Sequence, residues 1–332
     1  MKNILNRLFE QKSLAYEEAK EILMNIGLNK YNSSEVAAFM TVYLMRNITI
    51  DELAGFRDAL LDLCIKIDLS DFETIDLCGT GGDGKDTFNI STLSSFVVAG
   101  AGYKVAKHGN YGVSSGCGSS NVLEYFDYKF TNSEELIKKS IDTAGICFLH
   151  APLFHPALKN VGPIRRELRV KTFFNILGPM VNPSFPQNQM VGVFSLEVAR
   201  LYAYLYQQTT KNFAIVHSLD GYDEISLTNN FKLVTNQTDE ILNPEFLGFT
   251  KIRQSEIAGG NTVENSAKIF MSVLNGESTD AQLNVVLANS ALAIKTIDSK
   301  ISIEKSLELA KKSIFDKKAL LSFQKLIEIS KS

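Results

Sequence analysis

The chain has 332 residues, of which 45% are hydrophobic, so it can bury a full core and is long enough for more than one domain. Its net charge of −3 gives no general attraction for nucleic acid or for an anionic membrane, so we expect neither as a partner. Its four cysteines show neither C-x-x-C pairs nor metal-ligand spacing with histidine, which predicts reduced thiols. The first residues lack a secretory signal pattern and no apolar run is long enough to span a bilayer, so we expect a cytoplasmic location.

The opening 70 residues have a helical pattern. Apolar residues recur at three-and-four spacing between Val36 and Leu44, and Asn32/Glu35 and Thr49/Glu52 have the spacing of capping boxes. Since no strand pattern occurs in this stretch, it predicts a small all-helical domain over residues 1–70.

The pattern after residue 70 changes to short apolar runs that alternate with helical segments. The predicted strands are 73–78, 103–107, 145–149, 190–194 and 213–217. This alternation predicts an α/β domain over residues 71–332, with a mainly parallel central sheet flanked by helices and a helical C-terminal region. Ligands of such sheets bind beyond the carboxyl ends of the strands, so the loops that follow these strands should converge.

Residues 79–92 contain four glycines between a predicted strand and a predicted helix. Glycine lets backbone N–H groups approach an oxyanion, and the following helix offers further free N–H groups, so the segment predicts a phosphate site. It matches two common fingerprints only in part. Asp86 stands where a P-loop needs Ser or Thr, and residues 101–104 lack the acidic residue of a dinucleotide site. Asp83 would repel a phosphate unless a cation or a ligand hydroxyl lies between them.

Three further segments carry candidate chemistry. Lys107 opens a loop rich in small residues that suits a second anion contact, and His108 beside it is more plausible as an orienting group than as a general base. Asp223-Glu224 follows a predicted strand and suits a hard cation. Arg165 and its neighbour Arg166 either recognise a carboxylate or form a surface network with glutamate.

The ordered set of these motifs resembles the anthranilate phosphoribosyltransferase family of tryptophan biosynthesis. The segments that carry the resemblance are 79–83, 89–92, 107–110, 155–168, 174–179 with 182–183, and 223–224. The resemblance implies a nucleoside phosphorylase/phosphoribosyltransferase-like fold in which part of 160–185 joins the helical domain. It implies transfer of phosphoribose from phosphoribosyl pyrophosphate to anthranilate, releasing pyrophosphate, with no covalent protein nucleophile. It further implies about two Mg²⁺ ions per subunit and a homodimer built through the helical domain.

The resemblance also assigns roles to individual residues. The donor-binding residues are Gly79, Gly82, Asp83, Thr87, Asn89, Ile90, Ser91, Thr92, Lys107, His108, Gly109, Asn110, Tyr111, Gly112, Val113, Ser114, Ser115 and Ser119. Anthranilate would contact Gly79, Asn110 and Arg165, the arginine through the carboxylate, and the metal ligands would be Ser91, Asp223 and Glu224. Two positions depart from the pattern: Tyr111 replaces an expected arginine, and Gly116-Cys117 replace a longer polar pair.

Two alternatives share the resembled fold. A pyrimidine-nucleoside phosphorylase is disfavoured by Asp223-Glu224 and by the arginine segment. A non-catalytic nucleic-acid-binding relative is disfavoured by the acidic charge balance.

Overall fold

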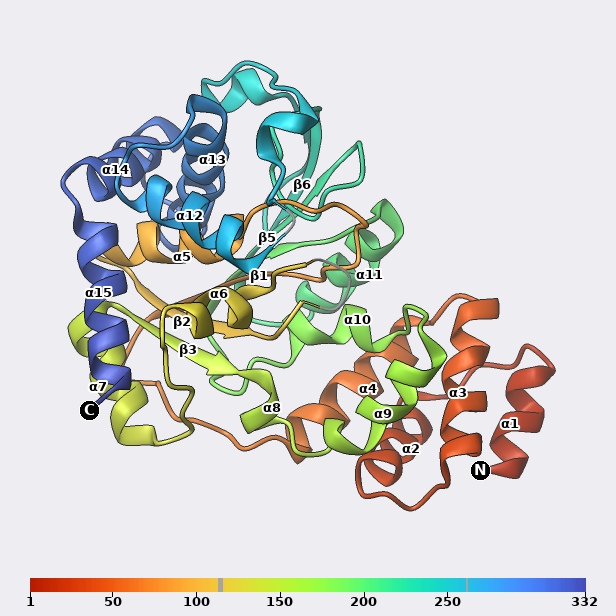
Figure 1. Cartoon of the computed structure of the whole chain (residues 1–332). Coiled ribbons are helices and arrows are strands. Elements are labelled where there is room, and N and C mark those ends of the chain that lie inside the picture. Colours follow the sequence, from red (N-terminus) through yellow and green to blue (C-terminus); the bar gives the residue numbers. More distant parts are fainter. Residues whose placement is uncertain (113–115, 261) are drawn as a thin grey trace. The chain divides into compact units, whose positions relative to one another are not determined.

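A computed structural model describes residues 1–112, 116–260 and 262–332 (Figure 1). The chain divides into two compact units. The first comprises residues 1–67 and 151–185, and the second comprises residues 68–150 and 186–332. The first unit is therefore built from two segments that lie far apart in the sequence.

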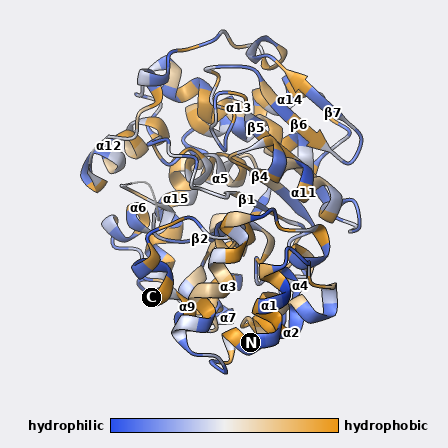
Figure 2. Cartoon of the chain, turned by 90° about the vertical axis from the view of Figure 1, so that its right-hand side faces the viewer, coloured by the Kyte–Doolittle hydropathy of each residue, from blue (hydrophilic) through white to orange (hydrophobic). Residues whose placement is uncertain are grey.

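The first unit is helical. Its helices are α1 (Lys2–Phe9), α2 (Tyr16–Gly27), α3 (Ser33–Met45), α4 (Ile50–Leu63), α8 (Ala151–Phe154), α9 (Leu158–Leu168) and α10 (Phe174–Leu177), followed by the 3₁₀ turn η1 (Gly178–Met180). Both predicted capping boxes are present, at Asn32 and Thr49. Figure 2 shows hydrophobic and hydrophilic residues interleaved along α2 and α4, as expected for helices with one buried side.

A core of aromatic rings joins the two segments of the first unit. Phe39, Tyr43 and Phe56 come from α3 and α4, and Phe173 precedes α10. The Phe173 ring stacks on Phe56 with centroids 4.7 Å apart and meets Tyr43 edge-on at 5.2 Å. Such contacts add to the gain from apolar burial.

The second unit contains a seven-stranded sheet in the order β3-β2-β1-β4-β5-β6-β7. Its strands are β1 (Thr74–Gly79), β2 (Lys104–Gly109), β3 (Ile146–His150), β4 (Asn188–Gly192), β5 (Asn212–Ser218), β6 (Phe231–Thr235) and β7 (Asp239–Leu242). The first five strands pair in parallel, whereas β6 and β7 add in antiparallel orientation. The predicted mainly parallel sheet is confirmed. The strand prediction did not include β6 and β7, and the residues of β7 are mostly exposed, which weakens any hydrophobic signal.

Helices cover both faces of this sheet. They are α5 (Ile90–Gly100), α6 (Ser119–Tyr125), α7 (Glu134–Ala144), α11 (Leu196–Tyr206), α12 (Val263–Leu274), α13 (Asp280–Ile297), α14 (Ile303–Phe315) and α15 (Lys318–Ser330), with 3₁₀ turns η2 (Pro244–Leu247) and η3 (Gln254–Ile257). None of the helices within the described ranges is long and apolar enough to cross a membrane.

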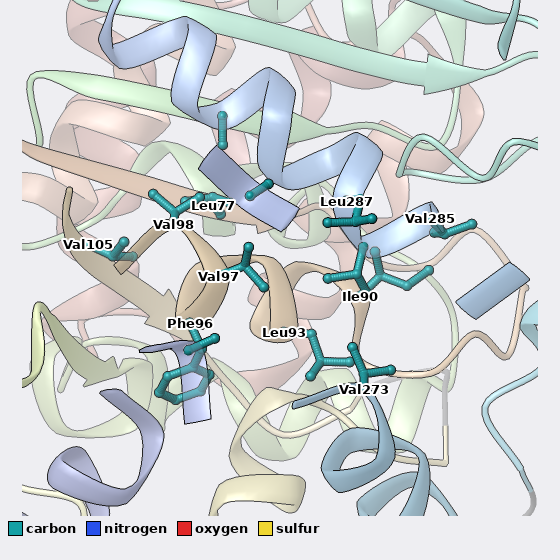
Figure 3. Packing of buried hydrophobic residues seen from close by; sticks show 14 of the residues in the cluster. Leu77, Ile90, Leu93, Phe96, Val97, Val98, Val105, Val273, Val285 and Leu287 are labelled. Atoms are coloured by element: carbon teal, nitrogen blue, oxygen red, sulfur yellow. The ribbon is translucent and has the colours of Figure 1, made fainter. Parts of the chain in front are cut away.

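Side chains alternate between the two faces of the sheet along each strand, so their contacts show which helices cover which face. Leu77 and Met190 belong to the core cluster that includes α5 and α13, and Figure 3 shows Leu77, Val97 and Leu287 within that packing. The neighbouring residue Gln189 points to the opposite face, where its Oε1 accepts a hydrogen bond from the Tyr206 hydroxyl of α11 at 3.0 Å. The sheet is thus enclosed on two sides, which leaves its carboxyl edge for function.

The strand order reverses direction between β1 and β4. The chain moves outward through β2 and β3 on one side of β1, and then through β5 on the far side of β4. Open parallel sheets bind ligands beyond the carboxyl ends of the strands at such a switch point. The glycine-rich segment after β1 and the loops after β2 and β5 all start at this edge.

Candidate functional site

The glycine loop, defined here as residues 79–89, adopts a backbone that favours glycine. Gly81, Gly82 and Gly84 have φ values of 61°, 73° and 72°, in the left-handed region. A Cβ at Gly81 or Gly84 would meet nothing within 4 Å, so the backbone conformation, rather than lack of space, calls for glycine there. Gly79 differs, because a Cβ there would lie 2.3 Å from Oδ2 of Asp223.

The acidic loop, residues 220–224, follows β5 and is joined to the glycine loop by hydrogen bonds. Gly81 N–H donates to Asp223 Oδ2 at 2.7 Å, and Ser91 N–H, in the first turn of α5, donates to Glu224 Oε1 at 3.2 Å. Thr87 Oγ1 donates to Glu224 Oε2 at 3.4 Å. The structure therefore brings the predicted metal ligands Ser91, Asp223 and Glu224 together.

Burial and mutual repulsion disturb the carboxyl groups of this site. The pKa of Asp223 is raised to about 7, first by burial and then by the nearby charge of Asp83. Burial also raises the pKa of Glu224 well above its usual range, with further contributions from Asp223 and Asp83. Three carboxyl groups at one sheet edge thus favour protonation or a bound cation.

Lys107 supplies a buried cation to the same edge of the sheet. Its side chain is 2% exposed, and its Nζ donates to the carbonyl oxygen of Leu77 at 2.5 Å and to Ser91 Oγ at 3.4 Å. Burial lowers the pKa of its ammonium group, whereas the carboxylates of Asp76 and Glu224 act in the opposite direction. Lys107 therefore partly offsets the charge of the carboxyl groups near it.

The donor atoms at this edge suit magnesium. Ser91, Asp223 and Glu224 offer hard oxygen atoms, which Mg²⁺ prefers. Among the described residues no group of three or more His, Cys, Asp or Glu side chains could hold a metal ion by itself. Mg²⁺ commonly binds through one or two carboxylates together with water and substrate phosphates, so the residues present fit this ion when it binds with a phosphate ligand.

The loop after β2 spans residues 110–118, and Lys107, which was expected to open it, lies within β2. Hydrogen bonds tie the two ends of this loop together. The side-chain oxygen of Asn121 accepts from Gly112 N–H and Gly118 N–H, both at 3.0 Å. Ser119 Oγ donates to the carbonyl oxygen of Asn110 at 3.2 Å, which ties the two ends together. The predicted donor-binding residues Val113, Ser114 and Ser115 lie outside the described residues.

His108 and Gly109 fit tightly at the start of this loop. The backbone N–H of His108 donates to Oδ1 of the buried Asp76 at 3.1 Å. A Cβ at Gly109 would lie 2.5 Å from both Phe148 Cζ and Ser119 Oγ, so only glycine fits. These contacts fix where the loop leaves the sheet.

Tyr111 occupies the position where the family pattern has arginine. Its hydroxyl donates to Glu124 Oε1 of α6 at 3.2 Å, and its ring meets that of His150 edge-on with centroids 5.1 Å apart. The side chain thus anchors the loop to α6 and β3 and brings no positive charge.

The predicted residues around the start of α5 contribute mainly through their backbone. Ile90 and Thr92 are 0% and 1% exposed, and Ile90 lies within the hydrophobic packing of Figure 3. Asn89 uses its side-chain amide to donate to the Cys117 carbonyl oxygen at 3.0 Å, which links the two loops. Free N–H groups at a helix start favour anions.

Arg165 belongs to the first unit, whereas all the other predicted site residues belong to the second. Its Nη2 donates to Asn175 Oδ1 at 3.3 Å, and its guanidinium lies 5.4 Å from the centroid of the Phe174 ring. Burial lowers the pKa of this arginine, and within the described ranges neither Arg165 nor Arg166 forms an ion pair. Within these ranges the structure thus gives no support to an Arg–Glu surface network at these residues.

The sequence matches the helical bundle domain of a glycosyl transferase family over residues 2–64 and the a/b domain of that family over residues 71–320. It is 63% identical to the anthranilate phosphoribosyltransferase of Flavobacterium johnsoniae, and the alignment covers 99% of this chain and 100% of that protein. The chain belongs to the anthranilate phosphoribosyltransferase family.

Solved structures of this family have the same fold. The anthranilate phosphoribosyltransferase of Thermus thermophilus superposes with a TM-score of 0.92 at 28% identity and covers 99% of both chains. That of Saccharomyces cerevisiae, in complex with PRPP and Mg, superposes with a TM-score of 0.90 at 25% identity, covering 98% of this chain and 96% of the other.

Three residues that support this candidate site were not predicted from the sequence. A Cβ at Gly192, the last residue of β4, would lie 1.4 Å from the carbonyl oxygen of Asp223. Asn289 of α13 bonds both the N–H and the carbonyl of Ile225, at 3.1 and 2.9 Å, directly after the acidic loop. Gly259 N–H donates to the Asp86 carbonyl oxygen at 2.7 Å. Gly192 lies in the middle of the predicted strand 190–194, where a glycine can mark a close backbone approach, whereas no local signal identifies the other two.

Proposed function

We propose that this protein transfers the phosphoribosyl group of phosphoribosyl pyrophosphate to the amine of anthranilate, releasing pyrophosphate, in tryptophan biosynthesis. The observation that carries the proposal is the glycine loop bonded to Asp223 and Glu224 at the switch point of the sheet. It combines the backbone N–H groups of a glycine-rich turn and a helix start, which suit phosphate, with carboxylates for a cation. Membership of the anthranilate phosphoribosyltransferase family supports the same reaction.

Ser91, Asp223 and Glu224 would hold Mg²⁺, with two ions per subunit as the family resemblance implies. When bound, the metal neutralises the negative charge of the pyrophosphate leaving group. The PRPP and Mg of the yeast structure support this assignment. Asp83 lies close enough to Asp223 to share in the binding of the cation or of the ribose hydroxyls.

The glycine loop and the loop after β2 would bind the donor. Backbone N–H groups of the glycine loop and the ammonium of Lys107 stabilise the charge that grows on the pyrophosphate as the ribosyl bond breaks. Charge stabilisation and positioning together account for the acceleration, so the reaction needs no covalent protein nucleophile. The other donor-binding residues that the family resemblance implies would complete the contacts to phosphoribosyl pyrophosphate.

Anthranilate would contact Gly79, Asn110 and Arg165. Arg165 has no carboxylate partner within the described part of the chain, and a guanidinium binds a carboxylate through two parallel hydrogen bonds. Arg165 is therefore the group we assign to the carboxylate of anthranilate. The aromatic amine needs little activation as a nucleophile, and His108 would orient the donor side of the site.

A homodimer through the helical unit is part of the same proposal. Phe9, Leu28 and Met45 are 59%, 53% and 79% exposed on this unit, and large exposed apolar side chains favour a protein contact. Light scattering should give twice the monomer mass, and a monomer at micromolar concentration would contradict this part. The biosynthetic role of the family supports a cytoplasmic location.

The decisive assay follows the loss of anthranilate fluorescence after phosphoribosyl pyrophosphate and Mg²⁺ are added. We expect turnover that stops when EDTA removes the metal. Uracil, thymine and nicotinate serve as competing acceptors, and thymidine with phosphate tests nucleoside phosphorolysis. No anthranilate turnover by folded protein at saturating substrates would refute the proposal.

A further inference from the structure

A lysine and a tyrosine outside the assigned site residues join the two loops of the site. Lys85 lies in the glycine loop, and its Nζ is 4.7 Å from the centroid of the Tyr222 ring in the acidic loop. Tyr222 is 4% exposed and directly precedes Asp223. A lysine ammonium over the face of a tyrosine ring is attracted by the ring quadrupole, and the attraction grows when the pair is shielded from water.

The backbone and stem of Lys85 are also held in place. Its N–H donates to Asp83 Oδ1 at 3.0 Å, which fixes the turn before it. Its Cε would lie 3.6 Å from a Cβ at Gly221, and Gly221 has a φ of 101°. The lysine side chain therefore passes along the turn of the acidic loop and ends over Tyr222.

This contact differs chemically from the other links between the two loops. The hydrogen bonds from Gly81, Thr87 and Ser91 all end on carboxylate oxygens of Asp223 or Glu224. Those oxygens are the ones assigned to the cation, and an oxygen that coordinates a metal has fewer lone pairs for N–H and O–H donors. The contact between Lys85 and Tyr222 uses no carboxylate, so it can persist while the metal binds.

We propose that Lys85 is a positioning residue, which holds the glycine loop against the acidic loop through the face of Tyr222 and thereby preorganises the phosphoribosyl pyrophosphate site. This inference rests on the proposed function. Because preorganisation removes an ordering cost from binding, the effect belongs to the donor and not to anthranilate.

The test compares steady-state kinetics of wild type, Lys85→Met, Tyr222→Leu and the double variant. We expect each single variant to raise the KM for phosphoribosyl pyrophosphate about 3- to 30-fold. The KM for anthranilate and the kcat at saturation should stay within about twofold. The double variant should be no worse than either single variant, because both remove the same contact.

Conservative variants and a matched control separate this role from a general loss of structure. Lys85→Arg and Tyr222→Phe keep the cation and the ring, and both should restore the donor KM to near the wild-type value. Lys66 lies 5.6 Å from the Phe185 ring in the first unit, outside both loops. Lys66→Met should leave the donor KM unchanged.

Three outcomes would overturn the inference. Lys85→Met with a normal donor KM would show that the contact does no positioning. If Lys85→Met raises the donor KM as much in the Tyr222→Leu background as it does in the wild type, the lysine acts on phosphate directly. Equal increases in both substrates' KM values would show a general structural effect.

Failure of the proposed function gives a different result. Wild type would then show no turnover with anthranilate, whereas the coupling of Lys85 to Tyr222 remains measurable by thermal unfolding of the same four proteins. A coupling free energy of zero in that cycle would overturn the contact itself.

Discussion

The two units differ in the charge of their candidate site residues: carboxyl groups gather in the second unit, whereas the first contributes an arginine. In the second unit, Asp83, Asp223 and Glu224 lie near one another, and burial together with mutual repulsion raises the pKa of Asp223 and of Glu224. In the first unit, Arg165 lies on α9 beside an amide and an aromatic ring, and burial lowers its pKa. A charge kept in such surroundings destabilises the free protein and favours a ligand of opposite sign. The difference supports the proposed roles, in which the acidic loop binds a cation and the arginine binds a carboxylate.

The largest expected effect comes from removing the charges of the acidic loop. Asp223→Asn with Glu224→Gln should lower kcat/KM by about 10³-fold or more, because the metal no longer stabilises the leaving group. A Mg²⁺ titration of initial rates should lose its saturation behaviour. The surface variant Glu264→Gln, in a pair with Lys268, is the control and should behave as wild type. A wild-type response of the double variant to Mg²⁺ would contradict the proposal that Asp223 and Glu224 bind the metal.

Adding one methyl group at Gly192, next to the acidic loop, should have a smaller effect. Gly192→Ala places a Cβ 1.4 Å from the Asp223 carbonyl oxygen, so the loop must move, at a cost of about 2–4 kcal/mol in unfolding free energy. Gly162→Ala in α9 meets Arg166 Nη1 at 3.6 Å, an ordinary contact, but Pro163 follows it and disfavours a Cβ on the helical residue before it. This control variant should cost less than about 1 kcal/mol. Urea unfolding measures both variants, and equal stabilities would contradict this account of the loop.

Removing the arginine tests the other region. Arg165→Ala should raise the KM for anthranilate about 10- to 100-fold, with much less effect on the KM for the donor, because it removes a charge-assisted contact to one substrate. Arg165→Lys should recover only part of the loss, since an ammonium lacks the planar fork of two donors. Equal changes in both KM values would argue against a role in acceptor binding.

The smallest expected effect is a pH dependence of stability without metal. The pKa of Asp223 is about 7 in the folded protein, above its value in an unfolded chain, so between these values the folded state binds more protons. Stability from this group is complete at low pH and is lost as pH rises through about 7. In EDTA, Asp223→Asn should remove about 1–2 kcal/mol of the fall in unfolding free energy between pH 5 and pH 8. An unchanged pH profile in the variant would contradict the raised pKa, whereas added Mg²⁺ should stabilise only the wild type at pH 8.

Much of the fold follows from local pattern. The capping boxes at Asn32 and Thr49, the glycines that need a left-handed backbone, and the alternation of strands and helices are encoded in contiguous residues. The antiparallel β7 escaped prediction because this short edge strand has no buried face, whereas β6 is mostly buried and its five-residue run was missed. The residue roles themselves stay predictions until the variants are made.

By itself, the sequence determined the α/β class, the loops at the strand ends and the family to which they point, because periodicity and glycine, acid and base chemistry are local properties. Only the tertiary structure decided that Gly81 N–H donates to Asp223, that Gly192 makes room for the acidic loop, and that Tyr111 anchors a loop by its ring and hydroxyl. It also extended to residues 151–185 the segment that joins residues 1–67, where the resemblance implied only part of 160–185. The physical reason is that burial, steric fit and pKa depend on groups that come from distant parts of the chain, so they exist only once the chain has folded.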